Sequence, residues 1–202
     1  MGRKLEFDPD EKLKAAMRLF WAKGYAGTSL QDLVEQLEIN RFSLYNTFGD
    51  KRQLFVTALE RYSDQIIGRL IEPLLEPNAG LDALDRYLEQ LQRGLNSSAG
   101  DFGCLVQTIG LEAANGHAEL KELAVQRLQQ LGELLRQTLL RAREQGLLAE
   151  HIDPTAAADM LLAQVQGAIF LRRATGNSDQ SDRSLGMLRQ QLRTWRTDID
   201  QV

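Results

Sequence analysis

The chain has 202 residues, of which 43% are hydrophobic and 26% are charged, with a formal net charge of −4. This composition is ordinary for a soluble globular protein, and the slightly acidic total argues against a protein that coats nucleic acids indiscriminately. No apolar run approaches the ~20 residues needed to cross a membrane, and the first residues lack the apolar segment of a secretory signal. We therefore expect a cytoplasmic protein with no membrane partner.

Cysteine and histidine are scarce. Cys104 is the one cysteine, and the two histidines, His117 and His151, lie far apart in the chain. An intrachain disulfide is therefore impossible, and no familiar zinc-site spacing is present. Because the chain also lacks a glycine-rich phosphate loop, we expect no metal and no cofactor.

Helical spacing of apolar residues recurs along the chain, whereas no segment alternates as a strand would, which predicts an all-α fold. The first predicted helix has Asp8 as its N-cap and Pro9 in its first position, and it closes at Gly24. A second helix is predicted to open at Thr28 and to continue to about Leu37.

A third, very short helix is predicted from about 41 to 48. Asn40 is a favourable N-cap, and Ile39 and Leu44 occupy the two positions of a hydrophobic staple. Asp50 then caps a longer fourth helix, from about 51 to 72. A break of about three residues between the second and third helices is typical of a helix-turn-helix motif, which here covers about 29–48.

The rest of the chain predicts a larger helical body. Turn-forming and capping clusters separate five further segments, near 79–96, 104–114, 117–146, 154–175 and 182–199. This gives about nine helices in two domains, an N-terminal helix-turn-helix domain at 6–66 and a helical domain at 67–202.

The segment "TSLQDLVEQLEINRFSLYNTFGDKRQLF", residues 28–55, resembles the DNA-binding region of the TetR family of transcriptional repressors. The preceding "AAMRLFWAKGYAGTSL" is similar to that family's first helix and turn. The remaining chain resembles the family in helix count and length, and its "GCLV" segment, 103–106, is similar to some electrophile- or oxidant-responsive members. Two positions depart from the family pattern. Glu38 stands where glycine is common, so it must avoid a positive φ or adopt one at a cost, and Phe42 stands where small residues are commoner.

The resemblance implies a transcriptional regulator, not an enzyme. We expect a ligand-responsive repressor that binds a palindromic operator in double-stranded DNA as a homodimer and is released by a small-molecule inducer. An enzyme would need a recognisable set of catalytic groups. The nearest candidate, His151 beside Glu150 and Asp153, is better interpreted as a helix-entry cluster. A helical adaptor without DNA contacts would leave the outward residues of the third helix without a purpose.

Helical geometry divides the third helix into two faces. Leu44 and Phe48 are four residues apart and should face the core, which turns Phe42 and Asn46 outward. In a major groove, asparagine can bond adenine and phenylalanine can contact a thymine methyl group, so we expect A·T pairs in the inner half-site. Alternatively, Phe42 packs against the first helix or covers the turn.

Other polar residues are predicted to contact the DNA backbone, although each could be ordinary surface. Thr28 lies at a helix N-terminus that suits a phosphate, and Arg41 could reach a guanine edge or a phosphate. By resemblance to the family, the complete predicted DNA-binding set is Thr28, Arg41, Phe42, Ser43, Tyr45, Asn46, Thr47 and Lys51.

The last two predicted helices suit a dimer interface. The final helix has apolar residues at alternating spacings of three and four, which is a packing seam, and the helix before it is apolar around most of its girth. In the TetR family the corresponding helices form the dimer interface. The predicted interface residues are Met160, Leu185, Leu188, Leu192, Trp195 and Ile199. The alternative is that both helices close a monomeric core.

The resemblance further implies a ligand pocket among the middle helices. The candidate lining residues are Phe102, Cys104, Gln107, Thr108, Glu112, Gln164, Gln166 and Phe170. A helix N-terminus lowers the pKa of a thiol, so Cys104 could alternatively make the protein a redox or electrophile sensor, or it could be an inert core residue.

Overall fold

A computed structural model describes residues 7–197, and its regular elements in this range are helices. One antiparallel bridge, between Leu148 and Arg196, is the β-type pairing found there. The prediction of an all-α fold is confirmed. No helix in the described range is both long and apolar enough to cross a lipid bilayer.

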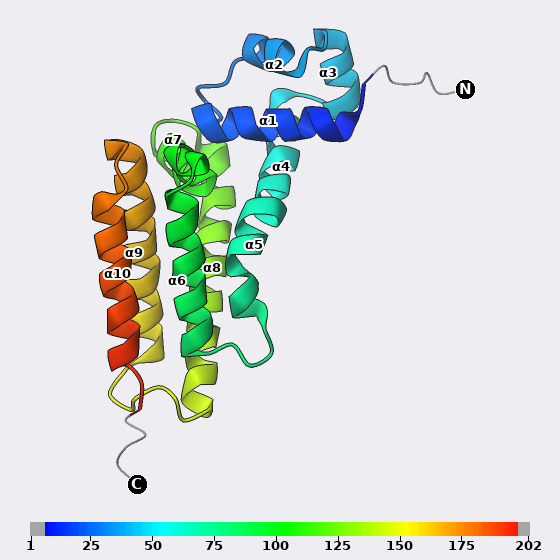
Figure 1. Cartoon of the computed structure of the whole chain (residues 1–202). Coiled ribbons are helices and arrows are strands. Elements are labelled where there is room, and N and C mark those ends of the chain that lie inside the picture. Colours follow the sequence, from blue (N-terminus) through cyan, green and yellow to red (C-terminus); the bar gives the residue numbers. More distant parts are fainter. Residues whose placement is uncertain (1–6, 198–202) are drawn as a thin grey trace.

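The N-terminal unit contains three helices at one end of the molecule (Figure 1). They are α1 (Pro9–Lys23), α2 (Leu30–Leu37) and α3 (Arg41–Phe48). From this unit a rod leads into the body (Figure 1). It consists of α4 (Lys51–Tyr62), a π-helical segment η1 (Ser63–Ile67) and α5 (Gly68–Ile71), followed by the 3-10 turn η2 (Glu72–Leu75).

The body consists of longer helices packed side by side, with shorter turns between them (Figure 1). They are α6 (Leu81–Leu95), η3 (Ser98–Phe102), α7 (Leu105–Ala114), η4 (Ala118–Leu120), α8 (Lys121–Glu144), α9 (Pro154–Thr175) and α10 (Asp179–Thr194). With α4, η1 and α5 counted as one rod, the α-helices of the described range number nine, as predicted.

Capping residues fix the starts of the first helices. The Asp8 carboxylate accepts the Asp10 N–H at 2.9 Å, and the Asn40 side chain accepts the Ser43 N–H at 2.8 Å. The second helix differs from the prediction, because Ser29 rather than Thr28 is its N-cap, in a reciprocal capping box with Asp32.

Glu38 closes α2 in the left-handed conformation, with φ at +52°, and it is the one non-glycine residue with a positive φ in the described range. The expected conflict at this position is therefore resolved by adopting the strained conformation. Such a conformation costs a residue with a Cβ roughly 1–2 kcal/mol.

The three-helix unit is held by an apolar core that includes Phe20, Leu37, Leu44 and Phe55, each at most 1% exposed. Phe20 and Phe55 meet edge to face, with ring centroids 5.0 Å apart. Leu44 anchors α3 as predicted, while Phe48 is only partly buried against the core. Leu44 is thus the main core contact of α3.

The predicted dimer seam on α10 is wrong, because its residues are buried within one chain. Leu185, Leu188, Leu192 and Trp195 are at most 5% exposed, since α10 packs against α6 and α9. Ile199 lies outside the described residues. Helical periodicity correctly identified a packing face, but that face serves the intramolecular core.

Ion pairs strengthen the attachment of α10 to α6. The guanidinium of Arg189 meets Asp85 with two hydrogen bonds of 2.7 and 2.8 Å. Arg189 holds the pKa of the Asp85 carboxyl below its ordinary value. Arg196 forms an ion pair with Asp82 through a single hydrogen bond.

Candidate nucleic-acid interface and ligand cavity

The outer face of α3 is open to solvent. Phe42 is 71% exposed and Tyr45 is 46% exposed, and Arg41 and Asn46 are also exposed. Exposure of an apolar aromatic ring to water is unfavourable, and few large apolar side chains in the described range have as high an exposed fraction as Phe42. The structure thus presents a short helix with aromatic, amide and guanidinium groups available to a partner.

Three hydroxyl-bearing residues are less available than predicted. Thr28 is fully buried, and its Oγ1 donates to the carbonyl oxygen of Gly24 at 2.6 Å, so its assignment as a phosphate contact is wrong. Thr47 Oγ1 is also covered and has no hydrogen-bond partner among the described residues. Ser43 is partly buried, and its N–H is occupied by the cap of α3.

Lys51, at the start of α4, lies over the ring of Tyr25, with Nζ 4.2 Å from the ring centroid. Burial lowers the pKa of Lys51, although the negative charges of Glu112 and Asp32 oppose that effect. The cation–π contact places the ammonium group beside the α1–α2 loop.

Glu112, on α7, holds this loop instead of lining a cavity, which corrects its predicted role. Its two carboxylate oxygens accept the backbone N–H groups of Tyr25 and Ala26, each at 3.1 Å. Gly24 permits the approach, because a Cβ at this position would lie 2.2 Å from Glu112 Oε1. A side chain of the body therefore binds the backbone that leads into α2.

A second contact joins the N-terminal unit to the body. The indole N–H of Trp21, on α1, donates to the carbonyl oxygen of Gly103 at 2.8 Å. The Trp21 ring also lies 5.5 Å from the ring of Phe102, which places Phe102 at this junction.

Most other residues predicted to line the pocket are hydrogen-bonded elsewhere or exposed to solvent. Gln107 donates to the carbonyl oxygen of Gln166 at 3.0 Å, and Thr108 Oγ1 accepts a hydrogen bond from Arg173. Gln164 and Phe170 are exposed on the outer side of α9. Of the predicted lining, the structure brings only Cys104 and Gln166 to a cavity.

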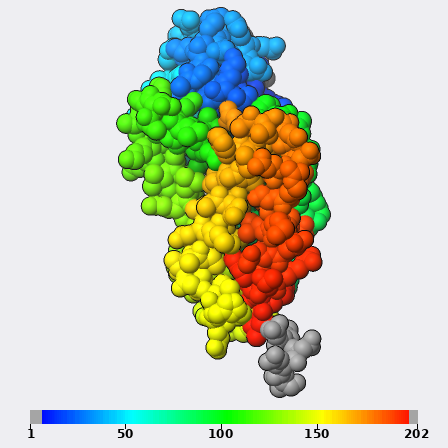
Figure 2. Space-filling model, turned by 90° about the vertical axis from the view of Figure 1, so that its left-hand side faces the viewer, coloured from blue at the N-terminus to red at the C-terminus, as the bar shows by residue number. Residues whose placement is uncertain are grey.

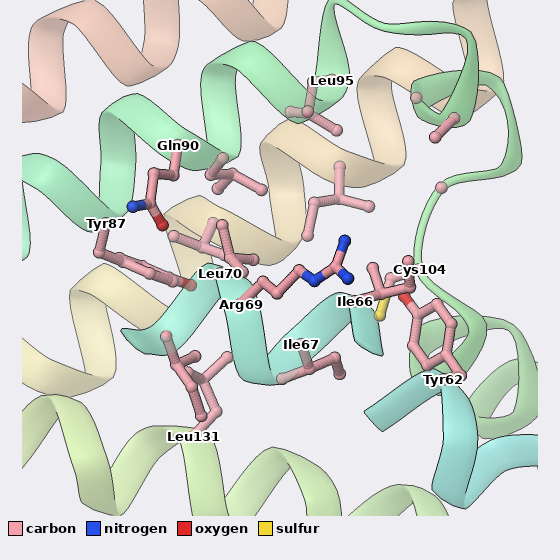
Figure 3. Close-up of a pocket in the computed structure, with 18 of the residues that line it drawn as sticks. Tyr62, Ile66, Ile67, Arg69, Leu70, Tyr87, Gln90, Leu95, Cys104 and Leu131 are labelled. Atoms are coloured by element: carbon pink, nitrogen blue, oxygen red, sulfur yellow. The ribbon is translucent and has the colours of Figure 1, made fainter. Parts of the chain in front are cut away.

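The cavity has a volume of about 640 Å³ and a mostly apolar wall. The rod forms one side of it, where η1 contributes Ile66 and Ile67 and α5 contributes Leu70 (Figure 3). Leu91 of α6 and Ile169 of α9 also line it. A volume in this range suits a small organic ligand. These lining residues were missed because, in sequence, they cannot be distinguished from an ordinary core.

Cys104 does not have the lowered pKa expected from its place at a helix start. Burial raises the pKa of the thiol, and this outweighs hydrogen bonds from the backbone of Gln107 and Val106 and from the Tyr62 hydroxyl. At neutral pH the sulfur is therefore protonated.

Two family models match the chain. "Bacterial regulatory proteins, tetR family" matches residues 13–58, and "Tetracyclin repressor-like, C-terminal domain" matches residues 80–188. The first match covers α2, α3 and most of α1 and α4. The second covers most of the helical body.

Relatives and solved structures agree with these matches. The uncharacterized HTH-type transcriptional regulator YezE of Bacillus subtilis is 32% identical over 181 residues, which is 89% of this chain and 93% of YezE. The HTH-type transcriptional repressor ComR of Escherichia coli is 30% identical over 82% of this chain and 80% of its own. A cysteine mutant of the TetR family regulator CifR, solved with 26-base-pair operator DNA, superimposes with a TM-score of 0.81 at 28% identity, covering 96% of this chain and 100% of CifR. The chain therefore belongs to the tetR family of bacterial regulatory proteins and is a DNA-binding transcriptional regulator.

Proposed function

We propose that this regulator is a cytoplasmic homodimer that binds a palindromic operator through α3, represses transcription, and releases DNA when a small molecule occupies the cavity. It performs no catalysis in this role. The observation that carries the proposal is the outer face of α3, where Phe42 is 71% exposed on a helix anchored from behind by Leu44.

On this face the proposed base contacts are Phe42 and Asn46, through thymine methyl groups and adenine edges. Arg41, Tyr45 and Lys51 are proposed to contact phosphates, which position the helix without reading sequence. The structure of the relative CifR with operator DNA supports a DNA-facing role for this part of the fold.

The proposed dimer surface is the outward side of α9 and α10, which lie next to each other on one face of the molecule (Figure 2). Met160, Phe170 and Met187 are exposed there, by 38%, 50% and 65%. This surface differs from the interface predicted from periodicity, whose α10 residues are buried within the chain. Met160 is the one residue that belongs to both sets. A twofold dimer places two recognition helices one DNA turn apart, ~34–36 Å.

Sedimentation tests the dimer. Phe170→Glu puts a charge on the proposed surface and should give monomers at micromolar concentration, whereas Val125→Glu, at an exposed apolar residue of α8, should leave the dimer intact. A wild-type chain that sediments as a monomer would exclude this part of the proposal.

A gel shift tests the DNA contacts. The protein should retard DNA from upstream of its own gene, and Asn46→Ala should weaken that binding, whereas Gln180→Ala, at an exposed position near the start of α10, should not. Equal binding by the wild type and Asn46→Ala would contradict the assignment of α3.

Three features support coupling between the cavity and the DNA-binding unit. The cavity wall includes η1 and α5, which continue directly into α4. Gly103 lines the cavity and accepts the Trp21 indole N–H. Finally, Glu112 binds the α1–α2 loop. A ligand that binds one arrangement of these contacts more tightly than another would shift the protein toward that arrangement. The shift, and with it the change in operator affinity, is limited by the ratio of the ligand's affinities for the two arrangements.

The alternative is a repressor in which Cys104 senses oxidants or electrophiles. Its position in the cavity wall favours this alternative, and the raised pKa of its thiol opposes it. Cys104→Ser distinguishes the two, because only a sensor would lose release of DNA by oxidants.

A further inference from the structure

Tyr87 presents a hydroxyl group without a partner to the cavity. The side chain reaches into the cavity wall from α6 (Figure 3) and is 1% exposed. Its Oη has no hydrogen-bond partner among residues 7–197. A buried hydroxyl left unpaired destabilises the folded chain. A ligand atom that accepts from this hydroxyl would remove the penalty.

Arg69 supplies a second donor to the cavity, on a side chain that is exposed to solvent. In Figure 3 its side chain extends from α5 along the cavity, and its guanidinium group points toward the side where Ile66 and Cys104 lie. None of the ion pairs of the described residues involves Arg69. Glu72 is the one acidic lining residue, and it is exposed.

The rest of the lining leaves the Tyr87 hydroxyl without an acceptor. Aliphatic side chains dominate the wall, and the amide of Gln90, in its better-bonded orientation, donates to the backbone oxygens of Arg69 and Leu70. The cavity therefore offers one buried hydroxyl without a partner in an apolar wall. It also offers a solvent-exposed guanidinium, that of Arg69, which forms no ion pair among the described residues. Such a site favours a molecule with complementary acceptors and a matching charge.

We propose that the cavity binds an amphipathic organic acid, with an apolar body, a carboxylate that pairs with Arg69, and a hydrogen-bond acceptor that bonds Tyr87 Oη. This inference deepens the proposed release by a small molecule and rests on it for its regulatory meaning. Binding itself can be measured on the free protein, without DNA.

Three probes test the assignment by titration calorimetry. 4-Benzoylbutyrate has a phenyl ring, a ketone and a carboxylate, 5-phenylvalerate lacks the ketone, and 4-benzoylbutyramide lacks the charge. The wild type should bind 4-benzoylbutyrate about fivefold more tightly than either analogue, since one partly exposed ion pair or one neutral hydrogen bond typically accounts for a factor of this size.

Variants assign each preference to its residue. Tyr87→Phe should abolish the preference for the ketone and keep the preference for the carboxylate. Arg69→Gln should abolish the preference for the carboxylate and keep the preference for the ketone. Arg183→Gln, which removes an exposed arginine of α10, should change neither preference. Tyr87→Phe should also melt at or above the wild-type temperature, because it removes an unpaired buried hydroxyl.

Equal binding of the three probes, binding of none of them, or preferences that survive both substitutions would overturn the proposal. These outcomes are distinct from failure of the proposed function. If the protein shows both preferences but does not retard operator DNA, the proposed ligand class would stand and the proposed regulatory function would fail.

Discussion

Glu112→Ala should loosen the backbone that leads into α2. The substitution removes both acceptors of the Tyr25 and Ala26 N–H groups, and no other acceptor is bonded to either group in the described structure. The edge-to-face contact of His117 with the Tyr25 ring would then remain between the body and the α1–α2 loop, and α1 would keep the bond from Trp21 to Gly103.

The magnitude follows from the two bonds. A hydrogen bond to a charged group contributes about 1.5–3 kcal/mol when it is shielded from water. The junction is only partly buried, with the bond to Ala26 exposed, so water can replace part of the loss. We therefore expect Glu112→Ala to lower the free energy of local opening of the loop by about 1–2 kcal/mol in total, which raises the opening equilibrium constant by a factor of about 5–30.

Amide hydrogen exchange measures this opening directly. Exchange at Tyr25 and Ala26 should accelerate about 5–30-fold in Glu112→Ala, and Glu112→Gln, which keeps one acceptor oxygen, should give a smaller increase. Glu122→Ala is the matched control, because it removes an exposed carboxylate from the first turn of α8. Unchanged exchange at both amides in Glu112→Ala would refute the role assigned to Glu112.

Four further predictions concern single residues. Because burial raises the pKa of the Cys104 thiol, iodoacetamide should alkylate it more than tenfold slower than N-acetylcysteine at pH 7.5, and its alkylation rate should rise only at alkaline pH; equal rates at pH 7.5 would contradict the burial argument. Asp85→Asn should lower the free energy of unfolding by about 1 kcal/mol at pH 7. This difference should begin to shrink near pH 4 and vanish only below the folded-state pKa of Asp85, which Arg189 holds below its ordinary value; a difference that persists in strong acid would exclude the ion pair as its cause. Glu38→Gly should raise the unfolding free energy by about 0.5–1 kcal/mol in urea titrations, since relief of left-handed strain exceeds the entropic cost of glycine, and a loss of stability would show that the strain is absent. Lys51→Ala should weaken binding to all DNA sequences alike and flatten the salt dependence by about one unit, and a loss confined to one sequence would contradict a phosphate contact.

Local features of the N-terminal unit were predictable from sequence. Asp8, Pro9 and Asn40 fix helix starts through their own conformational and hydrogen-bonding preferences, and the spacing of Leu44 identified the inner face of α3. These features depend on neighbours within four residues. The burial of Thr28 was not predictable, because the same residue type caps helices with its hydroxyl exposed.

Long-range features were not predictable in the same way. The apolar periodicity of α10 required a partner helix but could not distinguish a helix of the same chain from one of a second copy. Glu112 contacts Tyr25 across 87 residues of sequence, and no periodic pattern marks such a pair. The orphaned hydroxyl of Tyr87 also becomes evident only when its surroundings are known.

Selection from a pool of random double-stranded DNA tests the central claim most directly, that α3 reads an operator in a twofold dimer. The wild type should enrich a palindrome with half-sites about one helical turn apart and A·T pairs in their inner positions. Phe42→Ala and Asn46→Ala should each relax the preference at those pairs while the half-site spacing is retained. Enrichment of no motif, or of a motif that both variants select unchanged, would contradict the account.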